Sequence, residues 1–405
     1  MALHIMNEAN RCLQCKVPMC QKGCPISTPI PDVIKKFKEK KLMEAGKELF
    51  KNNPMSVFCS IVCDHQEQCA GHCVLGRKGT PVSFFAIERF ISDAYLDRIK
   101  VEPVEKNGKR CAVIGSGPAG LTASIILAMH GYDVTIFDDN NEIGGMLRYG
   151  IPEFRLSKTI IDRYKKLMDK FDIQFRPNTT LGEALTIDNL FRDGYSTVFI
   201  GTGVWRPKNL GIEGESLANV HFGISYLANP NSFTLGENVA IIGMGNVAMD
   251  VARTALRHGA QNVTLYARSK RIAASENEME YARLDGAEFV FGKQIEKITE
   301  QGPVFKTAIF DENDKVIGYE EELDQVHADS TILAVSQAPK NKLIMTTAGL
   351  EGNERGLLIT DENGMTTCPG VFAAGDVVHG SRTVVAAAEE AKRAAYAMMA
   401  YMEKQ

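Results

Sequence analysis

The sequence lacks several features, and each absence excludes a class of protein. No apolar run approaches the roughly 18 residues of a membrane-spanning helix, so no membrane association is expected. The formal net charge of −4 gives the chain no overall positive charge, so nucleic-acid binding is not expected. The start from Met1 to Glu8 has no basic stretch followed by an apolar core, so the cytoplasm is the expected location. With 44% hydrophobic and 24% charged residues, a chain of 405 residues fits a globular protein of about two or three domains.

Cysteine is almost absent beyond residue 73 and is concentrated before it. Eight of the ten cysteines form two groups of four, Cys12-x2-Cys15-x4-Cys20-x3-Cys24-Pro25 and Cys59-x3-Cys63-x5-Cys69-x3-Cys73. Without an export signal, such cysteines bind metal more often than they form disulfides. Runs of this kind hold iron–sulfur clusters, which pass electrons singly, and zinc is the structural alternative because it uses the same thiolates. In two-cluster ferredoxins the last cysteine of a run serves the other cluster, which predicts that Cys24 is separate from Cys12, Cys15 and Cys20.

The amino-terminal quarter is expected to be helical. Residues 33–51 place apolar side chains at helical spacing among lysines, which predicts a helix with a solvated basic face. A docking surface for an acidic partner is the alternative interpretation of these lysines. Residues 84–100 also have a helical pattern, and the polar stretch 104–109 is expected to be a linker.

Two dinucleotide-binding units are expected after the linker. In the first, the strand RCAVI leads into the turn GSGPAG, a helix over 118–130 and a strand over 133–138. The same order recurs over 238–267, with the strand NVAII, the turn GMGNVA, a helix to His258 and the strand NVTLYA. Because the two units lie far apart in the sequence, we expect two separate nucleotide domains.

The first turn suits the pyrophosphate of a dinucleotide. It runs Gly115-Ser116-Gly117-Pro118-Ala119-Gly120. Gly115 permits the tight turn, Gly117 lets the backbone approach the pyrophosphate, and Gly120 lets the helix pack on the strand. Asp138 ends the next strand, where a carboxylate can accept a hydrogen bond from a ribose hydroxyl. The alternative is a glycine turn that binds no ligand.

The second turn points to a nicotinamide coenzyme. It runs Gly243-Met244-Gly245-Asn246-Val247-Ala248, with alanine in place of the third glycine. No acid follows its second strand, and Arg268, Lys270 and Arg271 come there instead. Positive charge at this place suits the 2′-phosphate of NADP, so NADP(H) is favoured over NAD(H). A surface loop that happens to be basic is the alternative.

A third element lies near the carboxyl end. An apolar strand stops at Gly375-Asp376 and precedes a helix of small residues over 383–400. Beside two nucleotide turns, this arrangement resembles the second flavin-binding motif of two-dinucleotide flavoproteins. The resemblance implies that Asp376 contacts the ribityl or phosphate region of the flavin. It also implies that Thr383 and Val384 lie near the flavin ring.

Thiol–disulfide exchange is a rival for such a flavoprotein, because it needs a redox cysteine pair within the nucleotide domains. Only Cys111 and Cys368 occur there, far apart in sequence. Cys111 starts a strand that is expected to be buried, and Cys368 just precedes a strand. Electron transfer through the amino-terminal cysteines is therefore favoured.

The chain as a whole resembles the glutamate synthase small-subunit family of FAD and iron–sulfur oxidoreductases. This family also includes the amino-terminal part of dihydropyrimidine dehydrogenase and its bacterial small subunit. A further member is the flavin subunit of NADH-dependent ferredoxin:NADP oxidoreductases. The most specific segments are CLQCKVPMCQKGCP, CVLGRKGTPVSFFAIERF, VIGSGPAGLTAS, GGMLRYGIPEFRL, IIGMGNVAMDVA and GVFAAGDVVHGSRTVVAAAEEAKRAA. The resemblance implies an α-helical iron–sulfur domain followed by α/β two-dinucleotide-binding flavoprotein domains. It assigns residues 1–108 to two 4Fe-4S clusters, 109–225 and 339–405 to FAD, and 226–338 to NAD(P).

The resemblance also implies site residues. The first cluster would be held by Cys12, Cys15, Cys20 and Cys73, and the second by Cys24, Cys63, Cys69 and Glu88. Cys59 would then be spare, whereas the cysteine count alone would put all eight thiolates on iron. Gly145 and Arg148 join the FAD site by the same resemblance. Many NADP-using relatives carry paired arginines where this chain has Arg268-Ser269, so both coenzymes remain open.

These features together predict an NAD(P)H:acceptor oxidoreductase subunit. Hydride would pass between NAD(P)H and FAD, and single electrons would pass through the clusters to or from a partner subunit. The resemblance implies a glutamate synthase-like, dihydropyrimidine dehydrogenase-like or bifurcating transhydrogenase-like partner. Hydride transfer needs positioning more than a protein acid or base, so no catalytic side chain is expected. The alternative is a redox sensor or structural subunit that binds clusters and nucleotides without turnover.

Overall fold

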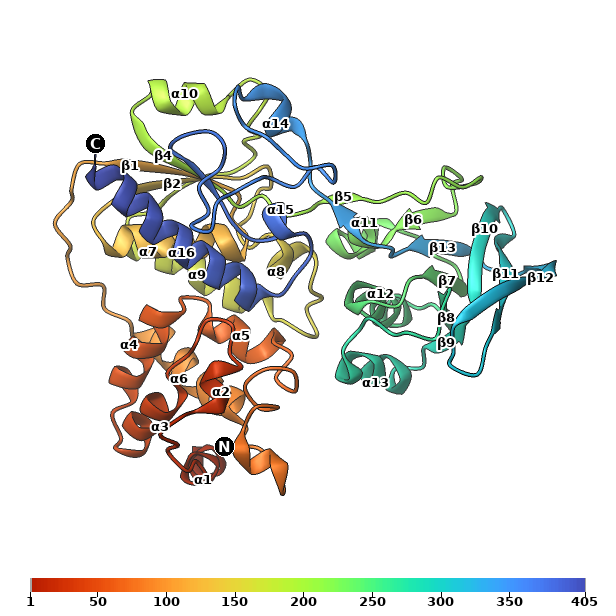
Figure 1. Ribbon diagram of the computed structural model, residues 1–405, viewed down its shortest axis with the longest axis horizontal. Helices are drawn as coiled ribbons and strands as arrows, with labels where there is room; N and C mark the ends of the chain where they lie inside the picture. The colour runs from red at the N-terminus through yellow and green to blue at the C-terminus, as the bar shows by residue number, and fades with distance from the viewer. Residues whose placement is uncertain (1, 405) are drawn as a thin grey trace. The chain divides into compact units, whose positions relative to one another are not determined.

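The computed structural model describes residues 2–404, which divide into two compact units (Figure 1). The first unit comprises the chain up to Leu147, Glu153–Val204 and the part from Pro339 onward, and the second comprises Arg148–Pro152 and Trp205–Ala338. No helix within residues 2–404 is both long and apolar enough to cross a membrane.

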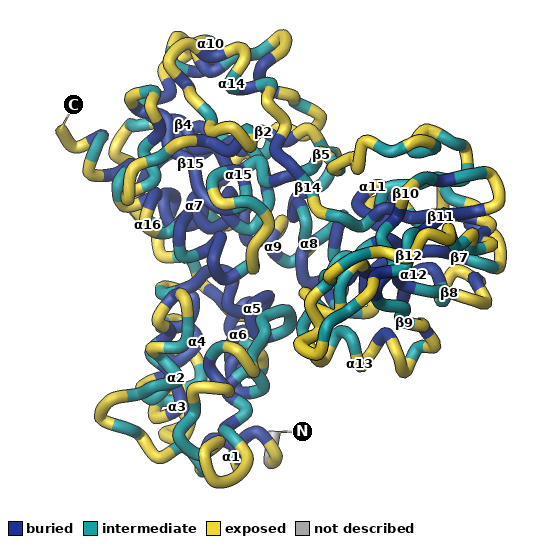
Figure 2. The backbone as a smooth tube through the Cα atoms, turned by 45° about the vertical axis from the view of Figure 1, so that its right-hand side comes forward, coloured by how far each residue is buried: buried dark blue, intermediate teal, exposed yellow. Residues whose placement is uncertain are grey.

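The first part of unit one is helical. Its elements are α1 (Ala2–Asn10), α2 (Met19–Lys22), α3 (Ile30–Lys38), α4 (Leu42–Asn52), α5 (Ser56–Val62), the 3-10 helix η1 (Val74–Arg77) and α6 (Phe84–Arg98). The apolar faces of α3, α4 and α6 meet in one core that includes Val33, Ile34, Leu49, Ile87 and Ile91, and the outward positions of these helices are exposed (Figure 2). This core positions the loops that carry the cysteines.

The single helix expected over 33–51 is wrong, because the chain forms two helices there. Helix α3 ends at Lys38 and α4 begins at Leu42. Lys40 between them has a φ of +63°, a left-handed conformation that no α-helix continues through. The apolar spacing of 33–51 therefore reports two amphipathic helices that bury the same kind of face.

A parallel sheet forms the rest of unit one. Its strand order is β15 (Val371–Ala373), β4 (Tyr195–Ile200), β1 (Arg110–Ile114), β2 (Asp133–Phe137) and β3 (Gln174–Arg176). The helices of this part are α7 (Pro118–Met129), α9 (Lys158–Lys170), α10 (Ile187–Arg192), α14 (Lys342–Thr346), α15 (Asp376–His379) and α16 (Val384–Glu403). Helices α7 and α16 pack on each other and both begin at the carboxyl edge of the sheet (Figure 1).

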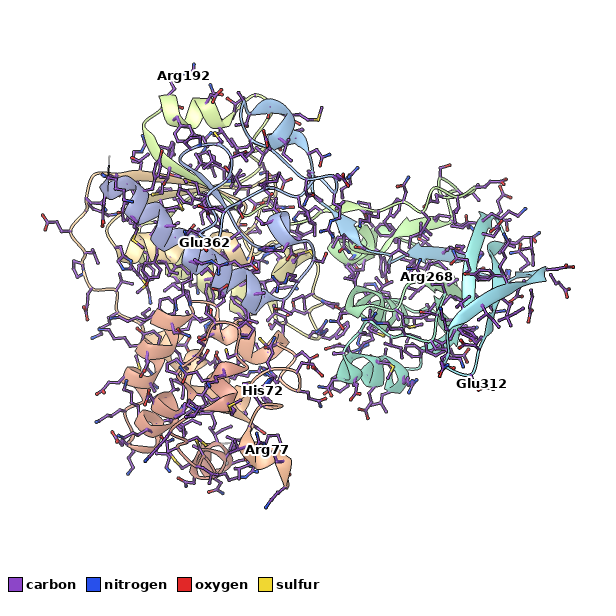
Figure 3. All side chains as sticks on the ribbon, viewed as in Figure 1. His72, Arg77, Arg192, Arg268, Glu312 and Glu362 are labelled. Atoms are coloured by element: carbon purple, nitrogen blue, oxygen red, sulfur yellow. The ribbon has the colours of Figure 1, made fainter. Side chains whose placement is uncertain are left out.

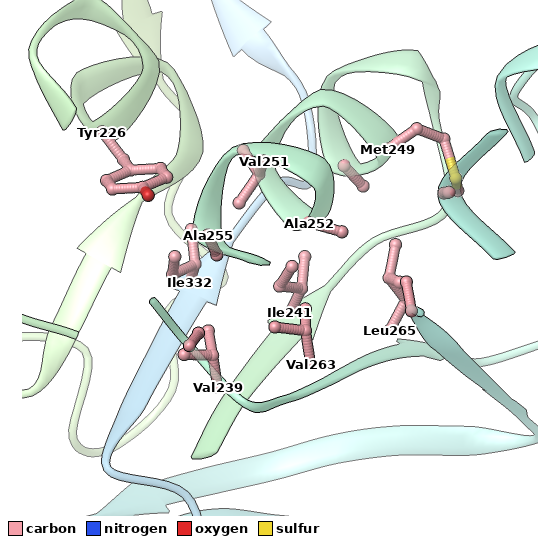
Figure 4. Packing of buried hydrophobic residues seen from close by; sticks show 14 of the residues in the cluster. Tyr226, Val239, Ile241, Met249, Val251, Ala252, Ala255, Val263, Leu265 and Ile332 are labelled. Atoms are coloured by element: carbon pink, nitrogen blue, oxygen red, sulfur yellow. The ribbon is translucent and has the colours of Figure 1, made fainter. Parts of the chain in front are cut away.

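The second unit has a parallel sheet of its own. Its order is β6 (Val220–Phe222), β13 (Ser330–Leu333), β7 (Asn238–Ile242), β8 (Asn262–Ala267) and β9 (Glu288–Phe291), with helices α11 (Gly223–Ala228), α12 (Asn246–Arg257), α13 (Glu276–Leu284) and the 3-10 helix η2 (Pro230–Ser232). Apolar side chains of α12 pack over β7, β8 and β13 (Figure 4). The unit takes in residues 205–225 as well as the 226–338 that we expected for a nucleotide domain.

Two smaller sheets complete the second unit. An antiparallel sheet joins β10 (Lys293–Thr299), β11 (Gly302–Phe310) and β12 (Val316–Gln325), and β5 (Arg206–Pro207) pairs with β14 (Gln337–Ala338). The last pair lies where the chain enters and leaves the unit.

Candidate functional site

The first predicted cluster site is a cavity of about 30 Å³ in the helical part. The cavity is lined by Cys12, Cys15, Cys20, Cys69 and Cys73. Its other walls are apolar and include Leu13, Pro18, Met19, Ile30, Ile34, Val74, Leu75, Val82 and Phe84. All four cysteines of the predicted first ligand set therefore line one largely apolar cavity, together with one cysteine of the second set.

Electrostatics also group these thiols. Burial raises the pKa of Cys20 to about 11, and the nearby Cys73, Cys12 and Cys15 thiols add to the rise because each opposes a further negative charge. Positively charged iron would reverse this effect and favour the thiolates. The donor set thus fits a 4Fe-4S cluster.

The second predicted ligand set includes Glu88 of α6, which is 6% exposed and close enough to Cys24, Cys63 and Cys69 to act on their charges. Burial raises the pKa of Glu88 well above its usual value, and the Cys59 thiol adds to this. Burial likewise raises the pKa of Cys24 and takes that of Cys69 to about 12, with Glu88 adding to both. A hydrogen bond with Cys59, burial and the nearby charges of Cys59, Glu88 and Cys24 raise the pKa of Cys63. A carboxyl and several thiols buried together without a cation suit a metal cluster.

Cys59 lies within the same group. It is 4% exposed on α5, and Asn53 Nδ2 donates a hydrogen bond to its Sγ at 3.2 Å. A hydrogen bond with the Cys63 thiol lowers the pKa of Cys59. Cys59 and Glu88 therefore both neighbour the second ligand set, as the two alternatives for its fourth ligand require.

The zinc alternative requires several ligands gathered around one ion. Zinc draws its four sulfurs to about 2.3 Å around one point. Within residues 2–404, no three His, Cys, Asp or Glu side chains converge closely enough for one ion. A 4Fe-4S cluster binds each thiolate to a separate iron atom and tolerates wider spacing. All ten cysteines are free thiols, so the eight amino-terminal ones form no disulfide framework.

The first glycine turn lies between β1 and α7 in unit one. Gly115 has a φ of +97°, and a Cβ there would lie 2.6 Å from the carbonyl oxygen of Gly201. Glycine is thus required by both the conformation and the space. Gly117 is the N-cap of α7, and Pro118, Ala119 and Gly120 form its first turn, so the free amides of the helix face the carboxyl edge of the sheet.

Asp138 lies beside this turn at the end of β2. Its Oδ2 accepts hydrogen bonds from Ser116 N and Oγ, both at 2.6 Å, and its Oδ1 accepts from Asn140 N and Nδ2, both at 2.9 Å. The side chain is 6% exposed. These donors hold the carboxylate at the turn.

Two further residues predicted to bind the flavin lie in different compact units. Gly145 lies so close to the turn that a Cβ there would be 2.8 Å from Gly117 Cα. Arg148 lies on α8 (Met146–Tyr149), at the point where the chain passes into the second compact unit. The structure therefore brings Gly145 to the first turn and groups Arg148 with the other unit.

The third sequence element also reaches the carboxyl edge of the first sheet. Burial raises the pKa of Asp376 to about 7, and its carboxylate accepts a hydrogen bond from Arg382 N at 3.0 Å. Thr383 is the N-cap of α16, where its Oγ1 accepts a hydrogen bond from Ala386 N, and Val384 is the first helical residue. Gly375 and Thr383 thus flank the short helix α15 and the three-residue turn that follows it, in front of α16.

Sequence reasoning missed two contributors to this edge. Gly201-Thr202-Gly203 ends β4 between the two flavin elements, and Gly201 N donates to Ile114 O at 2.8 Å. Glu390 of α16 is 7% exposed, accepts from Gly375 N at 3.0 Å and pairs with Arg382 at 2.9 Å. The glycine pair after the apolar run TVFI was the available signal for the first. Nothing local in the sequence marks Glu390.

The second glycine turn begins α12 in the other unit. Gly243 has a φ of +137°, and a Cβ there would lie 2.4 Å from Ala334 O. Gly245 is the N-cap of α12, and no other atom lies within 4 Å of the place where its Cβ would be. Asn246, Val247 and Ala248 form the first turn of the helix. An open face at Gly245 is what the close approach of a pyrophosphate requires.

The basic loop after β8 folds back onto this turn. Ala273 N and Ala274 N both donate to Met244 O at 3.0 Å, and Ser275 N donates to Asn246 Oδ1 at 3.0 Å. Lys270 is committed elsewhere, since it pairs with Asp314 and lies 4.8 Å from the centre of the Phe310 ring. Arg268, labelled in Figure 3, and Arg271 are exposed and form no ion pair within residues 2–404. Only these two of the three predicted cations are uncommitted.

No redox dithiol lies in the nucleotide-binding parts. Cys111 is fully buried in β1, where burial raises its pKa to about 12. Burial also raises the pKa of Cys368. Because both are free thiols and no other cysteine follows residue 73, disulfide chemistry has no pair to use.

Two nucleotide-binding turns, a flavin-type third element and an amino-terminal cluster domain define a flavin- and pyridine-nucleotide-dependent oxidoreductase with an iron–sulfur domain. Residues 109–391 match the pyridine nucleotide-disulphide oxidoreductase family, and residues 2–99 match the family described as dihydropyrimidine dehydrogenase domain II, 4Fe-4S cluster. The chain belongs to the pyridine nucleotide-disulphide oxidoreductase family, within the group that contains the small chain of glutamate synthase.

Curated relatives match along nearly the whole chain. The glutamate synthase (NADPH) small chain of Escherichia coli is 31% identical, over 98% of this chain and 91% of its own length. The NAD-dependent dihydropyrimidine dehydrogenase subunit PreT of Escherichia coli is 31% identical, over 99% and 95%. These matches confirm the resemblance and the class of enzyme inferred from the sequence.

Solved structures confirm the fold of the nucleotide-binding parts. Mycobacterium tuberculosis FprA in complex with NADPH matches with a TM-score of 0.62 and 17% identity, over 73% of this chain and 85% of that chain. Thioredoxin reductase of T. acidophilum matches with a TM-score of 0.57 and 20% identity, over 73% and 98%.

Proposed function

We propose that the chain is the electron-transfer subunit of an NAD(P)H oxidoreductase that holds FAD and two 4Fe-4S clusters. When bound, these groups supply hydride exchange with the nicotinamide and single-electron transfer to a partner subunit. The proposal rests chiefly on one observation: the second cysteine group begins on α5, where Cys59 lies and Cys63 follows the last turn, and α5 packs against the flavin-type part.

Several contacts make this junction. The Phe58 and Tyr164 rings lie 4.6 Å apart, and the Tyr164 hydroxyl donates a hydrogen bond to Pro54 O. Lys392 Nζ of α16 donates to Asn52 O at 2.8 Å and to Asn52 Oδ1 at 2.9 Å. Cys59 and Cys63 are therefore carried by the segment that touches the flavin-type part. This order favours electron flow from flavin to the second cluster and then to the first.

The residues have positioning roles in this proposal. Cys12, Cys15, Cys20 and Cys73 hold the first cluster, and Cys24, Cys63, Cys69 and Glu88 hold the second. FAD is held by residues of the first turn, the third element and their surroundings: Gly115, Gly117, Pro118, Ala119, Gly120, Asp138, Gly145, Arg148, Gly375, Asp376, Thr383 and Val384. Gly243, Gly245, Asn246, Val247, Ala248, Arg268 and Arg271 hold the coenzyme. No side chain acts as acid or base, because hydride transfer depends on alignment.

NADP(H) is the favoured coenzyme, because Arg268 and Arg271 are exposed beside the second turn and uncommitted. We propose the same domains as expected from the sequence: residues 1–108 for the clusters, 109–225 with 339–405 for FAD, and 226–338 for NAD(P). Of the FAD segment, residues 205–225 lie in the second compact unit. The partner is a catalytic or electron-accepting subunit, as the names of the glutamate synthase and PreT relatives suggest.

Substitution of Cys63 tests the order of transfer. We expect Cys63→Ala to keep FAD bound and reducible by NADPH. After NADPH it should show the electron paramagnetic resonance (EPR) signal of neither cluster, because the first cluster receives its electrons through the second. Flavin reduction is followed by its visible absorbance without oxygen, and Cys111→Ala serves as the matched control with both clusters intact. Loss of flavin reduction in a Cys63→Ala protein that still binds FAD would contradict the order.

A further inference from the structure

The loops around the first cluster cavity expose large apolar side chains. Leu13 is 61% exposed and Val17 is 58% exposed, and both lie between the predicted ligands Cys12 and Cys20. Leu13 also lines the cavity, so it lies between the cluster site and the surface. Large apolar side chains exposed beside a redox site are typical of protein docking surfaces.

The same loops carry charge of one sign. Residues 9–31 and 68–83 hold Arg11, Lys16, Lys22, Arg77 and Lys78, and no aspartate or glutamate. Arg11 pairs with Glu8 at 2.7 Å. The other four are exposed and form no ion pair within residues 2–404. Figure 3 labels Arg77, together with His72, on this face of the helical part. A basic region on a chain of net charge −4 is a local feature and not an overall bias.

The position of these loops matters for electron transfer. The second ligand set includes Cys63 next to α5, and α5 packs on α16 of the flavin-type part. The first ligand set lies on the loop after α1, on α2 and at the start of η1, and Figure 1 shows α1 and α2 farther from α16 than α5 is. The first cluster is therefore the end of the path that is open to another protein.

We propose that Leu13, Lys16, Val17, Lys22, Arg77 and Lys78, here called the basic–apolar patch, dock an acidic one-electron carrier protein. This inference rests on the proposed function and names the kind of partner that it serves. One NAD(P)H and two oxidised carriers give NAD(P)+, two reduced carriers and one proton released to solvent. Acidic residues around the carrier's own redox centre would meet the lysines and arginines, and an apolar centre would meet Leu13 and Val17.

Charge complementarity selects this occupant over a second copy of the chain. A two-fold interface places the same patch on both partners, and Lys16, Lys22, Arg77 and Lys78 would then oppose themselves. An acidic carrier gains attraction from all four, which raises the association rate at low ionic strength. A small apolar centre with a charged rim also suits a complex that must dissociate after each electron.

The test uses the full chain with both clusters, NADPH as donor and an acidic plant-type 2Fe-2S ferredoxin as the carrier. The patch variant is Lys16→Glu, Arg77→Glu and Lys78→Glu together. The matched control is Lys38→Glu, Lys51→Glu and Lys100→Glu, three exposed lysines of the same helical part that change the charge equally. Iron content, cluster EPR signals after NADPH and ferricyanide reduction by NADPH are measured for every protein.

We expect kcat/KM for ferredoxin to fall about tenfold or more in the patch variant at low ionic strength, and by less than about twofold in the control. The wild-type rate should fall as salt increases, and the patch variant should lose most of that dependence. Leu13→Ser should lower the rate without changing the salt dependence.

Other outcomes decide against the inference in distinct ways. Three results would overturn the docking surface and leave the proposed function standing. They are equal rates in the patch and control variants, a wild-type rate that does not change with salt concentration, and no ferredoxin reduction although the clusters are reduced. Self-association of the wild-type chain that the patch variant abolishes would assign the surface to a second copy instead. If NADPH leaves the wild-type clusters oxidised, the proposed function itself fails, and the docking surface fails with it.

Discussion

Glu88 and Asp376 are carboxylic acids placed where water is scarce. Burial raises the pKa of each, and a second acidic group nearby adds to the effect: Cys59 for Glu88 and Glu390 for Asp376. A fold keeps such groups at a cost in stability, so each is a candidate for a ligand contact. The two differ in the ligand expected, which is iron for Glu88 and the flavin for Asp376.

Glu88 and Cys59 can be separated as ligands by iron content and potential. We expect Glu88→Ala to lose the second cluster and fall from about eight to about four iron atoms per chain. Glu88→Gln should keep the cluster at a higher reduction potential, because a neutral amide removes negative charge. Cys59→Ala is the control and should keep all the iron. Loss of half the iron in Cys59→Ala, with none lost in Glu88→Ala, would assign the site to Cys59.

Asp376 predicts a pH dependence of stability. Its pKa is about 7 in the folded chain against a usual 3.8, so between these values only the folded chain holds the proton. The contribution of Asp376 to the free energy of unfolding is therefore fully present below about pH 4 and is lost as the pH rises toward 7. In FAD-free protein, Asp376→Asn should be more stable relative to wild type at pH 8 than at pH 5, by on the order of 1 kcal/mol or more in urea unfolding. Asp193→Asn, on an exposed residue, should show no such change; the same shift in both variants would refute the assignment.

At the scale of elements, the order strand, glycine turn and helix was readable in advance. The predicted strands over 110–114 and 238–242 coincide with β1 and β7, and the helix predicted over 118–130 is α7. Sequence reasoning succeeded here because buried parallel strands give unbroken apolar runs and the turns demand glycine.

Other elements carried no such signal. Strand β12 is exposed along most of its length, so it lacks the alternation that marks a half-buried strand. The break between α3 and α4 depends on the left-handed conformation of Lys40. Lysine is a good helix former, so the sequence does not predict a break at this residue. Cys59 and Glu88 approach each other only through the packing of α5 on α6, which neither helix shows alone.

The open face at Gly245 predicts a change in coenzyme binding without a change in folding. Its φ is −99° and nothing lies near a Cβ, so Gly245→Ala should fold normally. The added methyl would meet the pyrophosphate, and KM for NADPH should rise about tenfold or more while FAD content stays constant. Gly318→Ala, where a Cβ would contact only Ile309 at 4.0 Å, is the control in the same unit. An unchanged KM in Gly245→Ala would place the coenzyme elsewhere.

At the scale of the whole molecule, the chain combines two-electron and one-electron chemistry. The cysteine groups lie on the helical part of unit one, and their second group borders the flavin-type sheet domain through Tyr164 and Lys392. One family model matches the nucleotide-binding part and another matches the cluster part, and the curated relatives match along both. The sequence alone identified both parts, but the proposed path of electrons from the Glu88 and Cys63 site outward to Leu13 could be inferred only from the packing of α5 and α6.

An anaerobic titration with NADPH, followed by visible absorbance and low-temperature EPR, tests the central claim most directly. The account predicts that the flavin band bleaches and that the signals of reduced 4Fe-4S clusters then appear, with about eight iron atoms per chain. Protein that bleaches its flavin while iron-loaded clusters stay oxidised, or that carries no iron when prepared without oxygen, would contradict it.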